Sequence, residues 1–407
     1  MNPSAPVARH CPVCGSSSKS AIYSQHFSGL SGAALFEGYD VVVCNDCGLG
    51  YADGLPPQEA FNSYYRDLSK YESANNYGAL APYDLIRFPE TVGLIAGAIP
   101  DRAVRVLEIG CSTGGLLQAL QAGGYKNIVG LDPSPVCTRI ARERCGAETI
   151  TGSLSDLRPE NGPFDVIILG SVLEHLRDTE ETMNILKSLL PPTGYLYLEV
   201  PDASRFSEHT QAPFQEFSLE HITYFSPRSL DNLLGANGFT PVFSHQGTPE
   251  TRPGVFSFEI KALYRMTGKI SSPVRDVVTG PSLTAYVEKC RSMERGLSPV
   301  LDGLAESRRP IVVWGVGTQT QHLLSSSRLR DANIVAFVDS NPNYQGRTLH
   351  GAPVLAPAAL ASHSEPILIS SLQFEAEIAE QIRNGLGLKN EIITLRGTPA
   401  AAARNDA

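Results

Sequence analysis

The stretch Val106-Leu-Glu-Ile-Gly-Cys-Ser-Thr-Gly-Gly115 decides the fold of this chain. An apolar run that ends in a glycine turn and continues as a helical stretch, 116–122, is typical of a strand, turn and helix that hold a ligand at the helix N-terminus. Asp132 ends the next strand-like run, about where a carboxylate binds ribose hydroxyls. The pattern therefore predicts a site for a cofactor that contains adenosine.

The alternation of strand and helix continues along the chain. Strand-like runs occupy 104–109, 127–131, 164–169 and 195–200, and helical stretches such as 116–122 and 179–190 lie between them. This alternation predicts an α/β fold with a parallel, doubly wound sheet. After a mainly helical segment, 273–307, the alternation restarts at Ile311 and predicts a second, smaller α/β domain.

Two tight cysteine pairs precede this core, Cys11-Pro-Val-Cys14 and Cys44-Asn-Asp-Cys47. Two thiolates two residues apart can bind one side of a Zn(II) ion, so two such pairs complete a tetrahedral site with no position left for substrate. The alternative is four unrelated thiols, but a turn glycine follows each pair. We predict one structural zinc in a small N-terminal lobe.

Composition narrows the class of protein. The chain has 407 residues, 42% of them hydrophobic, and no uninterrupted apolar run approaches the roughly 20 residues of a membrane helix. The first ten residues lack the apolar stretch of a secretion signal, and a thiolate metal site explains the cysteines better than a disulfide framework. The net charge of −9 without a Lys/Arg block argues against nucleic acid. We expect a cytoplasmic protein with a small-molecule substrate and no membrane partner.

The glycine spacing discriminates between cofactors. The dinucleotide fingerprint has a second glycine where this chain has Ser112, so a pyrophosphate is disfavoured. The spacing of Glu108, Gly110 and Gly114 instead resembles motif I of class I S-adenosylmethionine methyltransferases. The resemblance implies that Glu108 supports the methionine end of the cofactor through its ammonium group. It also implies that the glycines let the cofactor approach the protein backbone closely and that Asp132 holds the ribose.

Further matches to this family follow in the expected order. The stretch Thr151-Gly-Ser-Leu154 falls where the family contacts adenine, and Phe164-Asp-Val-Ile-Ile-Leu-Gly-Ser-Val-Leu-Glu-His175 resembles its fourth strand and the Glu-His that follows. By this resemblance the cofactor-binding residues are Glu108, Gly110, Ser112, Gly114, Asp132, Pro133, Ser153, Leu154 and Ser171.

A third stretch carries a more specific resemblance, Glu216-Phe-Ser-Leu-Glu-His-Ile-Thr-Tyr-Phe-Ser-Pro227. A zinc lobe, a methyltransferase core with Glu-His-x-x-Tyr-Phe-Ser and a C-terminal Rossmann-like domain together resemble the nucleotide-sugar C-methyltransferases of deoxysugar and antibiotic biosynthesis. These enzymes methylate a carbon beside the ketone of a thymidine-diphosphate sugar. The resemblance implies a catalytic pair, Glu220 and His221, and a second active-site histidine, His175.

Methylation of such a carbon requires a base that removes the proton next to the carbonyl. His221 is the candidate base, because an imidazole titrates near neutral pH and Glu220 could orient it. The alternative is that Glu-His only buttresses the following helix. Ser218 departs from the family, which has a tyrosine three residues before the histidine in relatives that act on keto sugars. A serine cannot reach the same atom or serve as the same proton donor.

We predict four segments: a zinc-binding lobe, 1–55; a methyltransferase domain, 56–268; a helical connector with a Rossmann-like domain, 269–397; and a disordered tail, 398–407. In the third segment, Val313-Trp-Gly-Val-Gly317 and Asp339 repeat the strand, turn and acidic-end pattern. A second nucleotide site is one interpretation. Because Thr320 replaces the third glycine, an empty scaffold that walls the substrate cleft is favoured, and we infer no second cofactor.

Three functions stay open at this stage. The leading one is a C-methyltransferase that acts on a nucleotide-linked keto sugar, as a monomer or homodimer. The second is an O- or N-methyltransferase of another small metabolite, where transfer needs mainly positioning. The third is a zinc-knuckle interaction protein with a vestigial methyltransferase core, against which the complete set of motif I residues speaks.

Overall fold

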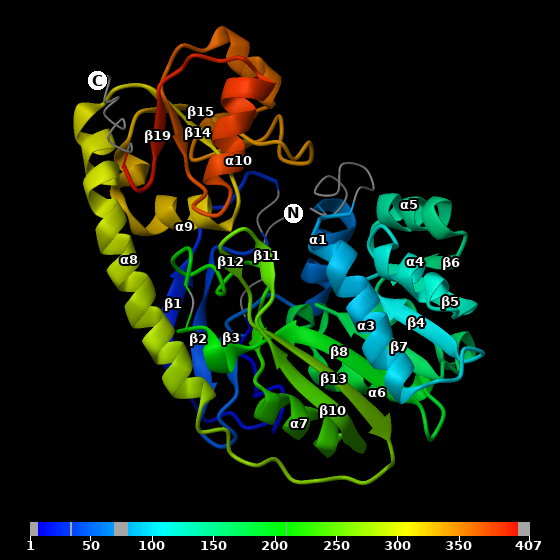
Figure 1. The fold of residues 1–407 in the computed structure, drawn as a ribbon. Coiled ribbons are helices and arrows are strands. Elements are labelled where there is room, and N and C mark those ends of the chain that lie inside the picture. Colours follow the sequence, from blue (N-terminus) through cyan, green and yellow to red (C-terminus); the bar gives the residue numbers. More distant parts are fainter. Residues whose placement is uncertain (1–6, 33–34, 69–79, 209, 398–407) are drawn as a thin grey trace, which may run out of the picture.

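The computed structural model describes residues 7–32, 35–68, 80–208 and 210–397. The predicted tail, 398–407, therefore lies outside the described residues. Among the described residues, no helix is both long and apolar enough to span a membrane. Figure 1 shows three parts: a small N-terminal sheet, a large α/β core, and a second α/β unit reached through one long helix.

A seven-stranded sheet forms the core, in the order β10-β13-β8-β7-β4-β5-β6. Five strands are parallel, and β13 pairs antiparallel with both β8 and β10. Their bounds are β4 Arg105–Ile109, β5 Asn127–Asp132, β6 Glu148–Thr151, β7 Val166–Gly170, β8 Tyr195–Pro201, β10 Phe239–Gly247 and β13 Glu259–Met266. The predicted α/β class and parallel sheet are confirmed, and each strand predicted in this sheet is present within two residues of its expected bounds.

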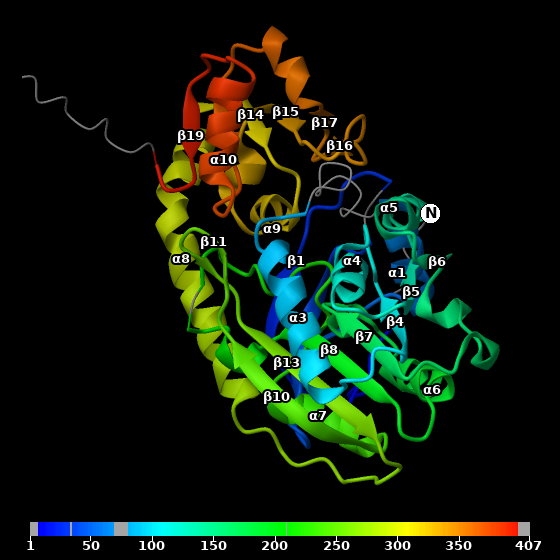
Figure 2. The ribbon, with the colours of Figure 1, turned by 45° about the vertical axis from the view of Figure 1, so that its right-hand side comes forward.

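Helices cover both faces of this sheet (Figure 2). On one face α3 (Asp84–Ala98), α4 (Gly115–Ala122) and α5 (Pro135–Cys145) bury apolar side chains against β4, β5 and β7. On the other face α6 (Thr179–Leu189) and α7 (Pro227–Ala236) pack together with the cysteine-bearing lobe. Because strands of a parallel sheet are covered on both sides, they are continuous apolar runs.

The N-terminal lobe is a four-stranded antiparallel sheet of β1 (Lys19–His26), β2 (Gly38–Cys44), β3 (Gly50–Asp53) and β9 (Thr223–Tyr224). The last strand comes from the methyltransferase region and pairs with β3, Gly50 opposite Tyr224. Helix α1 (Gln58–Leu68) connects the lobe toward the core. The lobe thus shares a sheet with the segment that follows the predicted Glu-His pair.

Helix α8 (Thr279–Ser307) runs along one side of the molecule (Figure 1). Its first half packs with the N-terminal sheet, through Leu283 and Tyr286, and its second half packs with the C-terminal unit, through Leu297 and Leu301. That unit has a six-stranded sheet in the order β16-β17-β15-β14-β18-β19. Its elements are β14 Ile311–Trp314, α9 Thr318–Ser326, β15 Ile334–Val338, β16 Thr348–Leu349, β17 Ala352–Leu355, β18 Ile367–Ile369, α10 Glu375–Glu380 and β19 Ile392–Thr394. A separate small hairpin, β11 Glu250–Arg252 and β12 Val255–Phe256, lies earlier in the chain, between β10 and β13.

Candidate active site

The turn between β4 and α4 requires glycine at two positions. Gly110 and Gly114 have φ angles of 74° and 80°, a region that side chains disfavour. A Cβ on Gly110 would lie 2.6 Å from the Val172 side chain, and one on Gly114 would lie 2.8 Å from the backbone of Ala141. The glycines therefore let the turn approach its neighbours closely and leave its backbone open to a ligand.

Asp132, at the end of β5, holds this turn in place. One of its carboxylate oxygens accepts a 2.9 Å hydrogen bond from the Ser112 N–H, and the other accepts one from the Ser134 N–H, also at 2.9 Å. Ser112 itself has a φ of 46°, which the bond from its N–H to Asp132 helps to stabilise. The acidic residue thus shapes the site in addition to the ribose role predicted for it.

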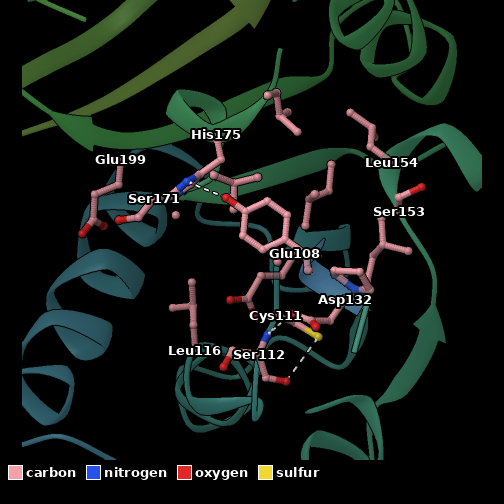
Figure 3. A pocket seen from close by; sticks show the side chains of 18 of the residues that line it. Glu108, Cys111, Ser112, Leu116, Asp132, Ser153, Leu154, Ser171, His175 and Glu199 are labelled. Carbon is pink, nitrogen blue, oxygen red and sulfur yellow. Dashed lines mark hydrogen bonds between the residues drawn. The ribbon is translucent and has the colours of Figure 1, made fainter. Parts of the chain in front are cut away.

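A cavity of about 490 Å³ lies over the carboxyl ends of β4, β5, β7 and β8. Figure 3 shows Glu108, Ser112, Asp132 and Leu154 around it. Of the predicted cofactor-binding residues, those that line it are Glu108, Gly110, Ser112, Asp132, Pro133, Ser153, Leu154 and Ser171. Gly114 does not line it, and instead forms the N-cap of α4. The position of the cavity is the one expected for a ligand of an open α/β sheet.

Glu108 is a cavity residue with a strongly raised pKa. Its side chain is 6% exposed, and burial together with the nearby Asp132 raises its pKa to about 8, although Arg87 acts in the opposite direction. Within the part of the chain that the structure describes, its Oε2 atom has no hydrogen-bond partner. A buried carboxylate oxygen in a cavity fits a ligand that carries an ammonium or sulfonium group.

The sequence prediction missed a buried ion pair on the wall of the same cavity. Glu199, near the end of β8, accepts a 2.9 Å hydrogen bond from Arg87 of α3, and both residues line the cavity. The strand-end position that singled out Asp132 applies equally to Glu199 and could have identified it. Arg87 lies in a helix without a motif, so only the fold brings it to the site.

His175 ends a short 3-10 helix, Leu173–His175, directly after β7, and it lines the cavity (Figure 3). Its Nδ1 atom lies 2.8 Å from the backbone oxygen of Glu220 and 3.0 Å from the Tyr65 hydroxyl. The rings of His175 and His221 are 5.0 Å apart, edge to face. The fold therefore brings the two predicted histidines together; His175 lines the cavity, and His221 does not.

The turn that carries Glu220 and His221 is shaped by Ser218. Its hydroxyl oxygen accepts hydrogen bonds from the N–H groups of Glu220, at 3.2 Å, and His221, at 3.1 Å. The carboxylate of Glu220 accepts a 3.4 Å hydrogen bond from Tyr64. Position 218 thus has a local backbone role that a tyrosine side chain could not fill.

The N-terminal lobe also supports this turn. The buried guanidinium of Arg9 donates from Nη1 to the backbone oxygens of Ala52 and Ile222, each at 3.0 Å, and from Nη2 to that of Arg177. Ile222 in turn donates its N–H to the backbone oxygen of Glu174 at 3.0 Å. One side chain of the lobe therefore fixes the segments that carry both histidines.

The four predicted zinc ligands come together in the lobe. The Sγ atoms of Cys11, Cys14, Cys44 and Cys47 all lie within 4.8 Å of one another, with Cys11 and Cys47 at 3.4 Å and Cys14 and Cys44 at 3.5 Å. Tetrahedral thiolates at 2.3 Å from zinc are about 3.8 Å apart. The cluster fits a single zinc ion and makes four unrelated thiols a poor explanation.

Comparison with known families agrees with the site. The family described as "Methyltransferase domain" matches residues 76–243, and the family described as "C2185-like, N-terminal" matches residues 307–394. The first match contains the glycine turn, Asp132 and both histidines. The chain is an S-adenosylmethionine-dependent methyltransferase with the class I fold, which counts against the interpretation as a non-enzymatic interaction protein.

Individual relatives cover the chain to different extents. C-methyltransferase NovU of Streptomyces niveus is 24% identical over an alignment of 352 residues that covers 82% of this chain and 79% of the relative. Ubiquinone biosynthesis O-methyltransferase of Xanthomonas campestris pv. campestris (strain B100) is 27% identical over 154 residues, 35% of this chain and 64% of the relative. Among solved structures, the 1,6-didemethyltoxoflavin-N1-methyltransferase of Burkholderia thailandensis aligns over 55% of this chain and 97% of its own, with 18% identity and a TM-score of 0.40.

Proposed function

We propose that this enzyme methylates a carbon atom next to the ketone of a nucleotide-linked deoxysugar. The observation that carries the proposal is the contact between His175, on the wall of the cofactor cavity, and His221, at a ring distance of 5.0 Å. Imidazoles titrate near neutral pH and can remove a proton from carbon beside a carbonyl. The match to NovU, named a C-methyltransferase, covers 82% of this chain and supports the same function.

In this proposal the cavity residues hold S-adenosylmethionine, which supplies an electrophilic methyl group. Glu108 faces its ammonium, Asp132 accepts from the ribose hydroxyls, and Ser153 and Leu154 lie against the adenine. Pro133 and Ser171 complete the walls of the cavity, and Gly110, Ser112 and Gly114 shape the turn that admits the cofactor. A structural zinc at the four cysteines stabilises the lobe.

The acceptor then meets the histidines from the other side of the methyl group. His221 removes the proton next to the ketone, and Glu220 orients the segment that carries it. His175, whose Nδ1 lies 2.8 Å from the Glu220 backbone oxygen, links this segment to the cofactor cavity. The enzyme needs no nucleic acid or membrane partner for this reaction, and it acts as a monomer or homodimer.

A second function, methylation of an oxygen or nitrogen atom, is favoured by one specific observation. Position 218 is a serine that bonds to its own turn, where the resemblance implies a tyrosine in relatives that act on keto sugars. Transfer to oxygen or nitrogen depends mainly on positioning and one base. The Xanthomonas relative, named an O-methyltransferase, matches 35% of this chain and supports this alternative.

Exchange of a carbon-bound proton separates the two functions. The purified protein is incubated in deuterated water, without methyl donor, with a thymidine-diphosphate-linked 4-keto-6-deoxyglucose. Carbon methylation predicts deuterium uptake next to the ketone, and the His221→Asn variant should lose it while its affinity for S-adenosylmethionine is unchanged. Loss of a positioned general base typically lowers turnover by about 10²–10⁴-fold. Equal exchange in wild type and variant would reject His221 as the base.

A further inference from the structure

One buried carboxylate beside the histidine pair has no role in the proposed reaction. Glu174 precedes His175 in the short 3-10 helix after β7, and its side chain is 1% exposed. Its Oε1 atom lies 3.7 Å from Nε2 of His175. With a ring nitrogen of His221 they form a group in which one ligand atom from each residue lies within 4.8 Å of the other two. The fold thus brings two imidazoles and one carboxylate together at one place.

This set of side chains matches a recurring kind of metal site. Two histidines and one glutamate can hold a zinc ion as its three protein ligands, with the fourth position open to water or substrate. Ligand atoms at roughly 2.0–2.2 Å from a tetrahedral zinc ion are about 3.4 Å from one another. The 3.7 Å between Glu174 and His175 is close to that spacing, so little rearrangement is needed to bind an ion.

The backbone holds these side chains in place. Nδ1 of His175 lies 2.8 Å from the backbone oxygen of Glu220, the kind of contact by which proteins orient a histidine that binds metal. Ile222, the residue after His221, donates its N–H to the backbone oxygen of Glu174 at 3.0 Å and ties the two segments together. Because His175 lines the cofactor cavity, a ligand in the cavity can reach an ion bound here.

We propose that Glu174, His175 and His221 bind one divalent transition-metal ion and that this ion inhibits the enzyme. Imidazole nitrogens suit zinc and its first-row neighbours, whereas magnesium and calcium prefer oxygen ligands. A histidine that binds a metal through one ring nitrogen carries its hydrogen on the other, so it has no electron pair left to take a proton from carbon. The inhibition rests on the proposed function of His221 as the base, and the binding of the metal does not.

This site differs from the one formed by the four cysteines. The cysteine cluster offers four thiolates and no open position, which is typical of a structural zinc, whereas the Glu174 site offers three ligands and an open position. Dialysis against a chelator should therefore empty the Glu174 site and leave the zinc of the cysteines in place. The inhibitory ion is the exchangeable one.

The first test measures metal binding without any substrate. Dialysed protein is titrated with cobalt(II), which should bind once per chain and give visible absorption bands without the charge-transfer band of a cobalt–thiolate bond. Glu174→Gln should weaken binding by more than about tenfold, since even residues behind metal ligands contribute that much. His175→Asn should lose the same bands. The control is Glu181→Gln, which removes an exposed carboxylate from the cavity wall and should bind as wild type does. No uptake by wild type, or equal affinity in Glu174→Gln and Glu181→Gln, would overturn the proposal.

The second test measures inhibition. Deuterium exchange into the thymidine-diphosphate-linked 4-keto-6-deoxyglucose is followed as zinc is added, and each protein is compared with its own metal-free rate. Exchange by wild type and Glu181→Gln should fall as the site fills, and Glu174→Gln should require more than about tenfold more zinc for the same fall. Equal zinc sensitivity of all three proteins, or faster exchange with zinc, would contradict the inhibition. Absence of exchange in metal-free wild type would instead reject the proposed function, and the cobalt titration would still decide whether the metal site exists.

Discussion

At the scale of single residues, Glu108 makes cofactor binding dependent on pH. Burial and Asp132 raise its pKa to about 8, so the carboxyl is largely protonated at pH 7 in the protein without ligand. A cationic ligand favours the ionised form, so binding should release a proton. Affinity should therefore weaken as pH falls below 8, by up to about tenfold per pH unit. Calorimetry in buffers of different ionisation enthalpy measures the released proton.

The same group has an opposite effect on the stability of the ligand-free protein. Because the folded-state pKa lies above the unfolded value, the protonated folded form is favoured below the unfolded pKa, and that contribution is lost as pH rises from about 4.5 to about 8. Glu108→Gln should remove this pH dependence and the proton release together. Proton release that persists in Glu108→Gln would assign it to another group.

At the scale of elements, the glycine turn depends on backbone conformation. Gly114→Ala places a Cβ 2.8 Å from the Ala141 backbone at a φ of 80°, so we expect a loss of about 1–3 kcal/mol of stability and weaker cofactor binding. Gly93, inside α3, has nothing within 4 Å of its Cβ position. Gly93→Ala should therefore be neutral or slightly stabilising. Thermal unfolding and calorimetry compare the two, and equal effects would contradict the packing argument.

Strand β9 and Arg9 connect the lobe to the turn that carries Glu220 and His221. Arg9→Lys replaces a guanidinium that bonds to three backbone oxygens with a single ammonium, and each lost charged hydrogen bond costs about 1.5–3 kcal/mol. We expect turnover to fall more than cofactor affinity. Arg102→Lys is the control, because Arg102 also bonds to backbone oxygens, of Ile99 and Gly123, but far from the histidines. Equal losses of turnover in both variants would exclude a specific link to the turn.

Four parallel strands of the core, β4, β5, β7 and β8, were predictable because each is a continuous apolar run between helical stretches. The prediction did not include the parallel edge strand β6, which is a short, mostly polar segment, or β10 and β13, which pair antiparallel at the other edge. It also did not include β9, whose two residues join a sheet of another segment. A two-residue strand carries no periodicity, so only the tertiary fold reveals it. The Glu-His pair was identified from its motif. The contacts of Tyr65 with His175 and of Arg9 with Ile222 join residues far apart in the sequence, so only the tertiary fold reveals them.

At the scale of the whole molecule, we expect the cysteine-bearing N-terminal lobe to support the candidate active site as well as its own fold. Cys44→Ser should reduce bound zinc below one ion per chain and lower the yield of folded protein. Because β9 belongs to the lobe sheet, we also expect reduced turnover in the protein that is recovered. Cys145→Ser, in α5 and outside the cluster, is the control. A zinc-free Cys44→Ser variant with normal folding and turnover would contradict this prediction.

The most direct test of the whole account is the position of the transferred methyl group. The enzyme is given S-adenosylmethionine with a carbon-13 methyl group and a thymidine-diphosphate-linked 4-keto-deoxysugar, and the product is analysed by NMR. The account predicts a methyl carbon bonded to a ring carbon next to the ketone, with the proton at that position lost, and no such product from His221→Asn. A methyl group bonded to oxygen or nitrogen would contradict it.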